Sequence, residues 1–115
     1  MLSADNQHEL CVLGRTFANL HVYGCWWFCN TPSLIEHTTR VRLELLGAAF
    51  TAQHSDSRVL EQLLYKWPHA RAAIVKPLCE QYRALLASGW RVTEAQVRRD
   101  VARLFGGAFE EFLAK

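Results

Sequence analysis

Three residues with metal-binding side chains are spaced four apart, at His21, Cys25 and Cys29. In a helix this spacing puts an imidazole and two thiolates on one face, within reach of a single ion. A fourth ligand would have to come from elsewhere, and the candidates are His8, His37 and Cys79. Structural zinc sites usually take their ligands as close pairs from separate segments, and this chain has no second pair. We therefore expect no metal and no other cofactor, and we expect the cysteines to pack as small apolar residues.

Nucleophilic catalysis needs a nucleophile, a base and an orienting group held together, and no local signature of such a group is present. Five histidines are scattered along the chain, as are Asp5, Asp56 and Asp100. A small helical body also leaves little room for a pocket of roughly 300–1,000 Å³, the size that small ligands use. We therefore predict that this chain is not an enzyme.

Bulky aromatic side chains follow one another directly at Trp26, Trp27 and Phe28. In a helix they leave the axis about 100° apart, so one core-facing stripe cannot take all three. They either fill the core between several helices or place at least one ring at a contact with a subunit or partner. The predicted partner-binding residues are Tyr23, Trp26, Trp27, Phe28, Leu34 and Ile35.

The chain has 115 residues, enough for one domain covering 1–115 and too few for two. It is 50% apolar and 21% charged, which is ordinary globular composition. A net charge of +2 is mild, so any contact with nucleic acid would need a local basic cluster. Its start lacks the pattern of a signal peptide, and no run reaches the roughly 18 apolar residues that cross a bilayer. We expect a cytoplasmic protein with reduced thiols and no membrane contact.

The hydrophobic periodicity predicts an all-α fold, a single irregular bundle of about five helices with no sheet. A first helix is expected from about residue 5 to Cys29, and a second from Pro32 to about Gln53, with Ser33 and Glu36 as a capping box. Further segments follow over 59–67, from Pro68, from Pro77 to Ser88-Gly89, and from Thr93 to the end with a possible kink at Gly106-Gly107. On the second helix the periodicity turns Leu34, Thr38, Val41 and Leu45 inward and puts Arg42 on the wet side.

The most specific local pattern runs from Leu85 to Asp100 and includes Gly89-Trp90-Arg91-Val92-Thr93-Glu94-Ala95-Gln96-Val97. This stretch resembles the helix-turn-helix of bacterial arginine repressors. The resemblance implies a reading helix over 93–104, with Gln96, Arg98, Arg99 and Arg103 directed toward base edges or phosphates. Arginine repressors continue into a two-stranded wing, whereas here the helical pattern goes on. The alternative interpretation is an ordinary capped helix with solvated arginines.

The overall character and the stretch from Tyr23 to Ile35 resemble the small helical anti-activators of LuxR-type quorum-sensing regulators. That resemblance implies a negative regulator that binds a transcription factor, covers its dimerisation surface, and is often itself a homodimer. We expect this function, with a transcription regulator as the partner. The alternative function is a helix-turn-helix DNA-binding regulator that uses residues 93–104, and only this alternative involves nucleic acid.

Overall fold

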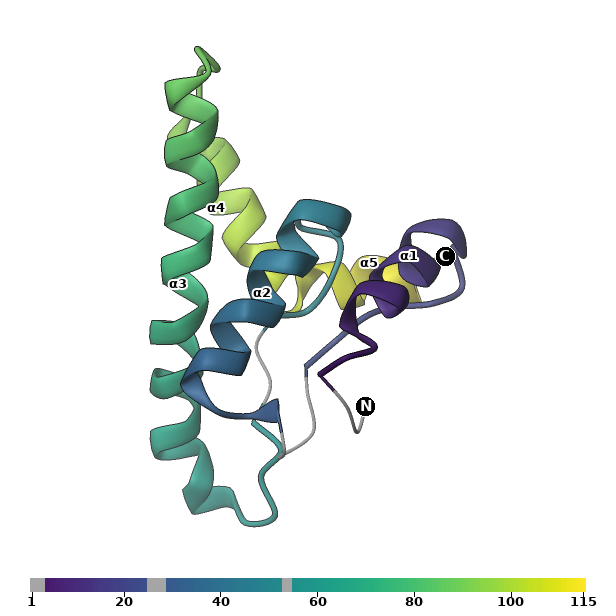
Figure 1. Ribbon diagram of the computed structural model, residues 1–115. Helices are drawn as coiled ribbons and strands as arrows, with labels where there is room; N and C mark the ends of the chain where they lie inside the picture. Colours follow the sequence, from purple (N-terminus) through teal and green to yellow (C-terminus); the bar gives the residue numbers. More distant parts are fainter. Residues whose placement is uncertain (1–3, 25–28, 53–54) are drawn as a thin grey trace.

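The all-α prediction is confirmed by a computed structural model, which describes residues 4–24, 29–52 and 55–115 (Figure 1). Trp26, Trp27, Phe28 and Cys25 lie outside the described residues. Within these ranges the chain has no strand, and its one β-type contact is an isolated parallel bridge between Tyr23 and Thr51. The helical elements are α1 (Gln7–Thr16), α2 (Pro32–Leu46), a 3₁₀ turn (Leu60–Gln62), α3 (Leu63–Ala87), α4 (Glu94–Ala102), a π-helical turn (Arg103–Gly107) and α5 (Ala108–Leu113).

The predicted first helix is wrong beyond Thr16. Phe17 adopts an extended conformation at the C-cap of α1, and the chain then runs without helix to Tyr23. Long-range packing overrides the helical spacing here, because Val22 is only 3% exposed and belongs to the core. Gly14 permits this arrangement: a Cβ at that position would lie 2.8 Å from a Val22 methyl group.

Helix α2 begins at Pro32, as predicted, but its N-cap is Thr31 and the expected capping box at Ser33 is wrong. The helix ends at Leu46, earlier than predicted, because Gly47 takes a left-handed conformation with φ of +61°. Its inward face also differs from the periodicity. The buried residues of α2 are Ile35, Thr38, Thr39 and Arg42.

The separate segments predicted between residues 63 and 88 form one helix, α3, which contains both Pro68 and Pro77. A proline removes one helical hydrogen bond, but α3 is not broken at Pro77, which lies buried within it. Helix α3 continues through it because Ala73, Ile74 and Leu78 pack into the core on either side. The predicted end at Ser88-Gly89 is confirmed, with Gly89 at φ of +90°.

The last two helices are joined across a kink, as the paired glycines suggested. Phe105 and Gly106 leave helical geometry, and the Ala108 amide donates to the carbonyl of Arg103. The carbonyl of Leu104 instead accepts a hydrogen bond of 2.8 Å from the amide of Ala52. The kink therefore fastens the C-terminal helices to the middle of the chain.

The core has two clusters of buried side chains. The first contains Val22, Phe50, Leu78 and Leu104, and the second contains Ile35, Ala70, Ala73 and Ile74. Ala52 and Phe105 pack against both clusters, which makes the core continuous. No helix in the described ranges is long and apolar enough to cross a membrane.

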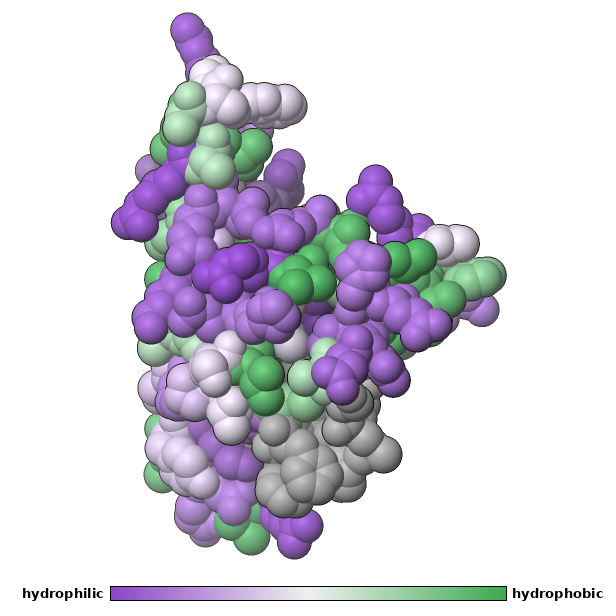
Figure 2. All heavy atoms as spheres, viewed as in Figure 1, coloured by the Kyte–Doolittle hydropathy of each residue, from purple (hydrophilic) through white to green (hydrophobic). Residues whose placement is uncertain are grey.

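Large apolar side chains also remain on the surface. Figure 2 shows them over the end of the molecule where α1 and α5 lie. The exposed apolar residues there are Val12, Leu13, Phe17, Leu20, Phe109 and Leu113. Single exposed apolar residues are normal, but a gathered set indicates a surface that another body covers.

Candidate functional site

Two extended segments, residues 20–24 and 50–52, lie side by side in the same direction. The Thr51 amide donates to the Val22 carbonyl at 3.0 Å, and the Gly24 amide donates to the Thr51 carbonyl at 3.2 Å. Helix α2 connects the two segments, so the chain has the connectivity of a βαβ unit, with a single parallel bridge in place of paired strands. In parallel α/β structures, ligands bind at the carboxyl ends of the strands. A site is therefore expected around the described residues that come after the two segments, in the loops from Cys29 and from Ser55 onward.

Hydrogen bonds connect the described parts of these two loops. The Asn30 side-chain amide donates to the Ser55 carbonyl at 3.4 Å, and Lys66 Nζ donates to the Asp56 carbonyl at 2.9 Å. Lys66 comes from the start of α3, so this helix supports the second loop. Both loops and the beginning of α3 thus meet at one end of the molecule (Figure 1).

Asp56 has a φ of +48°, and it is the one non-glycine residue with positive φ in the described part of the chain. Aspartate tolerates this region better than most residues, but the conformation is still uncommon. Backbone conformations of this kind gather at functional sites, where the surrounding structure maintains them. Asp56 lies in the second of these loops, where its backbone carbonyl accepts the hydrogen bond from Lys66.

A cleft of about 380 Å³ lies at the same end and is lined by Asn30, Tyr65, Lys66 and His69. Its size is that of a pocket for a small ligand. We call Asn30, Ser55, Asp56, Tyr65, Lys66 and His69 the loop-end site. An amine and an imidazole line the cleft, and the residue that accepts from Lys66 is an aspartate; residues of these types can bind an anionic, hydroxyl-rich molecule and transfer protons to and from it.

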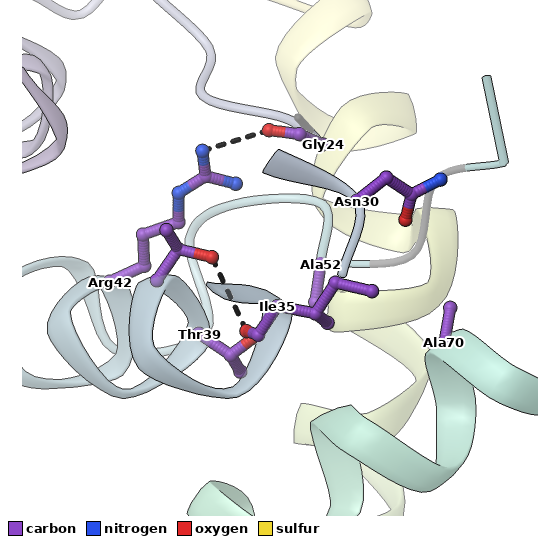
Figure 3. A pocket seen from close by; sticks show the side chains of 8 residues that line it. Gly24, Asn30, Ile35, Thr39, Arg42, Ala52 and Ala70 are labelled. Carbon is purple, nitrogen blue, oxygen red and sulfur yellow. Dashed lines mark hydrogen bonds between the residues drawn. The ribbon is translucent and has the colours of Figure 1, made fainter. Parts of the chain in front are cut away.

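Behind the loop-end site lies a cavity of about 10 Å³, shown in Figure 3, between α2, α3 and the two paired segments. Its lining includes Gly24, Arg42 and Ala52, and the Arg42 guanidinium points at the Gly24 carbonyl. The volume is that of one water-sized sphere, so this cavity holds no substrate.

No protein-family model matches the chain, and no curated protein matches it. Among solved structures, a uronate isomerase from Bacillus halodurans C-125 matches all of this chain, with a TM-score of 0.94 and 52% sequence identity. This chain is similar to part of an isomerase. It spans 27% of the length of that enzyme.

The isomerase match overturns the regulatory predictions. The resemblance to LuxR-type anti-activators, the role as a negative regulator and the transcription-regulator partner are wrong, and the expected homodimer loses its basis with them. The prediction that the chain is not an enzyme is also wrong, because the match points to part of a metabolic enzyme. The small size of the chain does not exclude catalysis, because the matched enzyme is longer and the chain covers 27% of it.

The predicted partner-binding residues fall in different environments. Tyr23 is 66% exposed, Leu34 is half-buried, and Ile35 is buried against α3. Trp26, Trp27 and Phe28 lie outside the described residues. The surplus apolar surface that motivated this set is equally expected of a part that packs against the rest of an enzyme.

The arginine-repressor resemblance is wrong too, and each residue expected to read DNA has an intramolecular partner. Gln96 forms a capping box with Thr93. The three arginines pair with carboxylates: Arg98 with Glu94 at 2.6 Å, Arg99 with Asp100 at 2.7 Å, and Arg103 with Glu111 at 3.0 Å. A glycine turn followed by a capping box is local helix chemistry, shared by many unrelated folds.

The predicted metal-ligand spacing required His21 to lie in a helix, but His21 lies in the first extended segment. Its Nε2 is 3.0 Å from the Thr51 hydroxyl, and its ring packs against Phe109 and Phe112, which also contact each other. Burial, and secondly the positive charge of Lys115, lower the pKa of His21. Among the described residues no group of three or more His, Cys, Asp or Glu side chains is placed to hold a metal ion.

Two of the cysteines behave as small apolar residues. Cys11 and Cys29 are buried, whereas Cys79 is exposed. Burial raises the pKa of the Cys11 thiol, and the charge of Arg42 opposes this only in part. Cys11 therefore stays protonated and is a poor nucleophile.

Sequence reasoning missed the loop-end site. Asp56 was counted among scattered carboxylates, and Lys66 and His69 received no role. The sequence does contain one signal for this arrangement. Gly47 ends α2, and the buried Phe50 follows three residues later. A glycine stop and a short apolar run after a helix are typical of an α/β unit.

Proposed function

We propose that this chain forms part of a uronate isomerase, an enzyme that rearranges a sugar acid. The observation that carries the proposal is the match over the full chain, at 52% identity and a TM-score of 0.94, to the enzyme from Bacillus halodurans C-125. The chain would contribute two adjacent parallel segments and the loops at their carboxyl ends. The loop-end site is then one wall of the active site.

The chemistry of the loop-end site supports this assignment. A uronate carries a carboxylate, for which Lys66 and His69 offer hydrogen-bond donors beside the cleft. Isomerisation of a sugar moves protons between neighbouring atoms, and a positioned carboxylate can take up and return a proton. Asp56 is our candidate for that group, on the evidence of its position and its unusual backbone conformation.

The exposed apolar surface gives independent support. The exposed apolar residues over α1 and α5 are typical of a surface that packs against another part of a protein (Figure 2). An enzyme of which this chain represents 27% would supply further elements to cover them.

A chimera tests the proposal. The matching segment of the Bacillus enzyme is replaced by these 115 residues, and isomerisation of a uronate is assayed. We expect activity in the chimera and none in the Bacillus enzyme lacking the segment. A folded chimera without activity would overturn the proposal.

An Asp56→Asn variant of the chimera tests the site itself. We expect activity to fall about 10²-fold or more, the usual contribution of a proton-transferring group. Glu61→Gln is the matched control, because Glu61 is an exposed carboxylate a few residues away. Equal activities for the two variants would remove Asp56 from the site.

Two further features remain proposals. We propose that residues 1–115 fold as one unit, supported by the core that Ala52 and Phe105 make continuous. We also propose a cytoplasmic location, supported by the free thiols of Cys11 and Cys79, which persist in reducing compartments.

A further inference from the structure

Helix α2 carries an arginine on its buried face. Arg42 is 2% exposed, and its guanidinium lies 6.0 Å from the centre of the Phe50 ring. Its Nη2 donates to Gln7 Oε1 at 2.7 Å and to the Gly24 carbonyl at 2.8 Å. Burying a guanidinium is unfavourable unless hydrogen bonds compensate, so these contacts define where the side chain can sit.

Gly24 is the point at which the chain leaves the first paired segment. Its amide donates to the Thr51 carbonyl, and its carbonyl accepts from Arg42, so both polar groups of this residue are held. Its φ is +40°, a conformation that favours glycine. The direction in which the chain enters the first loop therefore depends on how these two hydrogen bonds orient Gly24.

Apolar and polar side chains line the space beside this contact. The small cavity beside Arg42 is lined in part by Ile35, Ala52 and Ala70 (Figure 3). If the guanidinium were removed, the Gly24 carbonyl would lose its donor, and a carbonyl without a hydrogen-bond partner inside the protein is unfavourable.

We infer that Arg42 is a positioning residue for the loop-end site: it fixes the Gly24 peptide and thereby the start of the loop that leads to Asn30. Only the catalytic consequence of this inference rests on the proposed function. The local structural consequence can be measured on the chain itself.

The first test is amide hydrogen exchange by NMR on the Arg42→Ala variant of this chain. We expect exchange at the Gly24 and Thr51 amides to accelerate by about tenfold or more, while the α3 amides around Ile74 keep their rates. Added guanidinium should slow exchange again at these two amides, because it can occupy the space that the side chain leaves. Unchanged rates at Gly24 and Thr51 would overturn the inference.

Arg40→Ala is the matched control, because Arg40 lies on the same helix and pairs at the surface with Glu36 and Glu80. It should leave both amides unchanged. If Arg42→Ala does not fold, Arg42→Lys replaces it: an ammonium keeps the charge but lacks the planar fork, and exchange should still rise about threefold or more. Native exchange in Arg42→Lys would overturn the role of the guanidinium.

The second test places the same variants in the chimera. Arg42→Ala should lower kcat about tenfold with KM within about twofold of the parent, because Arg42 acts through the loop and touches no substrate. Guanidinium should restore part of kcat, and Arg40→Ala should be active. A native kcat for Arg42→Ala in an active chimera would overturn the positioning role. An inactive parent chimera would instead contradict the proposed function, and the exchange experiment would still decide on Arg42.

Discussion

The inner face of α2 and the outer face of α4 both carry arginines, and the two faces use them in opposite ways. Arg42 is 2% exposed and binds groups that are 18 and 35 residues away in the sequence. The Arg98 side chain is 78% exposed and pairs with Glu94, one turn earlier on its own helix. A buried guanidinium with distant partners defines how segments meet, whereas a solvated one stabilises only the helix that carries it.

The two kinds of arginine therefore mark two regions: the region around α2, which adjoins the loop-end site, and α4, whose ion pairs form within the helix. Around α2 the contacts join α1, the paired segments and α3, and they end at the loop-end site. Along α4 the ion pairs stay on one helix, and α4 meets the body through Tyr82, Asp100 and the kink before α5. Substitutions should therefore have large effects near α2 and small effects on α4.

The largest effect is expected at Phe50, which is 0% exposed below the Arg42 guanidinium. Phe50→Ala should lower the free energy of unfolding by about 3–5 kcal/mol, because it removes a buried ring and leaves a cavity. Urea denaturation followed by circular dichroism measures the change. Phe109→Ala is the control, since Phe109 is 44% exposed, and it should cost less than about 1 kcal/mol. Equal losses of unfolding free energy in the two variants would contradict the contrast between the buried Phe50 and the half-exposed Phe109.

The next effect is expected where α4 meets α3. The Tyr82 hydroxyl donates to Asp100 Oδ2 at 2.9 Å. Tyr82→Phe should lower the free energy of unfolding by about 2 kcal/mol, the range for a hydrogen bond to a charged group. Tyr65→Phe, at a ring that is 60% exposed, should change it by less than about 0.5 kcal/mol.

The same contact predicts a pH dependence. Burial, followed by the hydrogen bond to Asp100, raises the pKa of Tyr82 to about 12. The folded state thus holds this proton more tightly than the unfolded chain, where a tyrosine has a pKa of about 10. The contribution of Tyr82 is fully present below about pH 10 and is lost as the pH rises through about 12. The difference in urea midpoint between the native chain and Tyr82→Phe should shrink over that range, and a constant difference would contradict the assignment.

A smaller effect is expected at the start of α4. The Thr93 hydroxyl accepts from the Gln96 amide, and the Gln96 side chain accepts from the Thr93 amide. Thr93→Ala should cost about 1 kcal/mol, and Thr93→Ser should cost little because serine is an equally good cap. Unfolding curves of the two variants make the comparison, and a neutral alanine would show that the cap adds nothing to the stability of the chain.

The features predicted correctly from the sequence are those determined within one turn of helix. Pro32 begins α2, Gly89 follows the end of α3, the last helical segment starts at Thr93, and Gly106 kinks it. In each case the residue types act on the backbone beside them, so a short stretch contains the whole cause.

The features that sequence reasoning missed depend on residues far apart in the chain. Residues 17–23 have helical spacing, yet they form no helix, because Val22 packs into the core and its carbonyl accepts a hydrogen bond from the Thr51 amide. The periodicity put Arg42 in water because nothing near it announces Gln7 or Gly24 as partners. The loop-end site was not predicted for the same reason, because Asn30, Asp56 and Lys66 come together only after the two segments pair.

The smallest effect is expected at Arg98. Its guanidinium is 2.6 Å from Glu94, but both side chains are 78% exposed, so water and salt screen the pair. Arg98→Ala should change the free energy of unfolding by about 0.3–0.5 kcal/mol, and about 1 M salt should remove the difference. Glu94→Ala should cost more than Arg98→Ala, because Glu94 lies in the first turn of α4 and also interacts with the helix dipole. A salt-resistant loss of about 2 kcal/mol or more at Arg98 would place it with Arg42 as a buried anchor, and the distinction between the two faces would not hold.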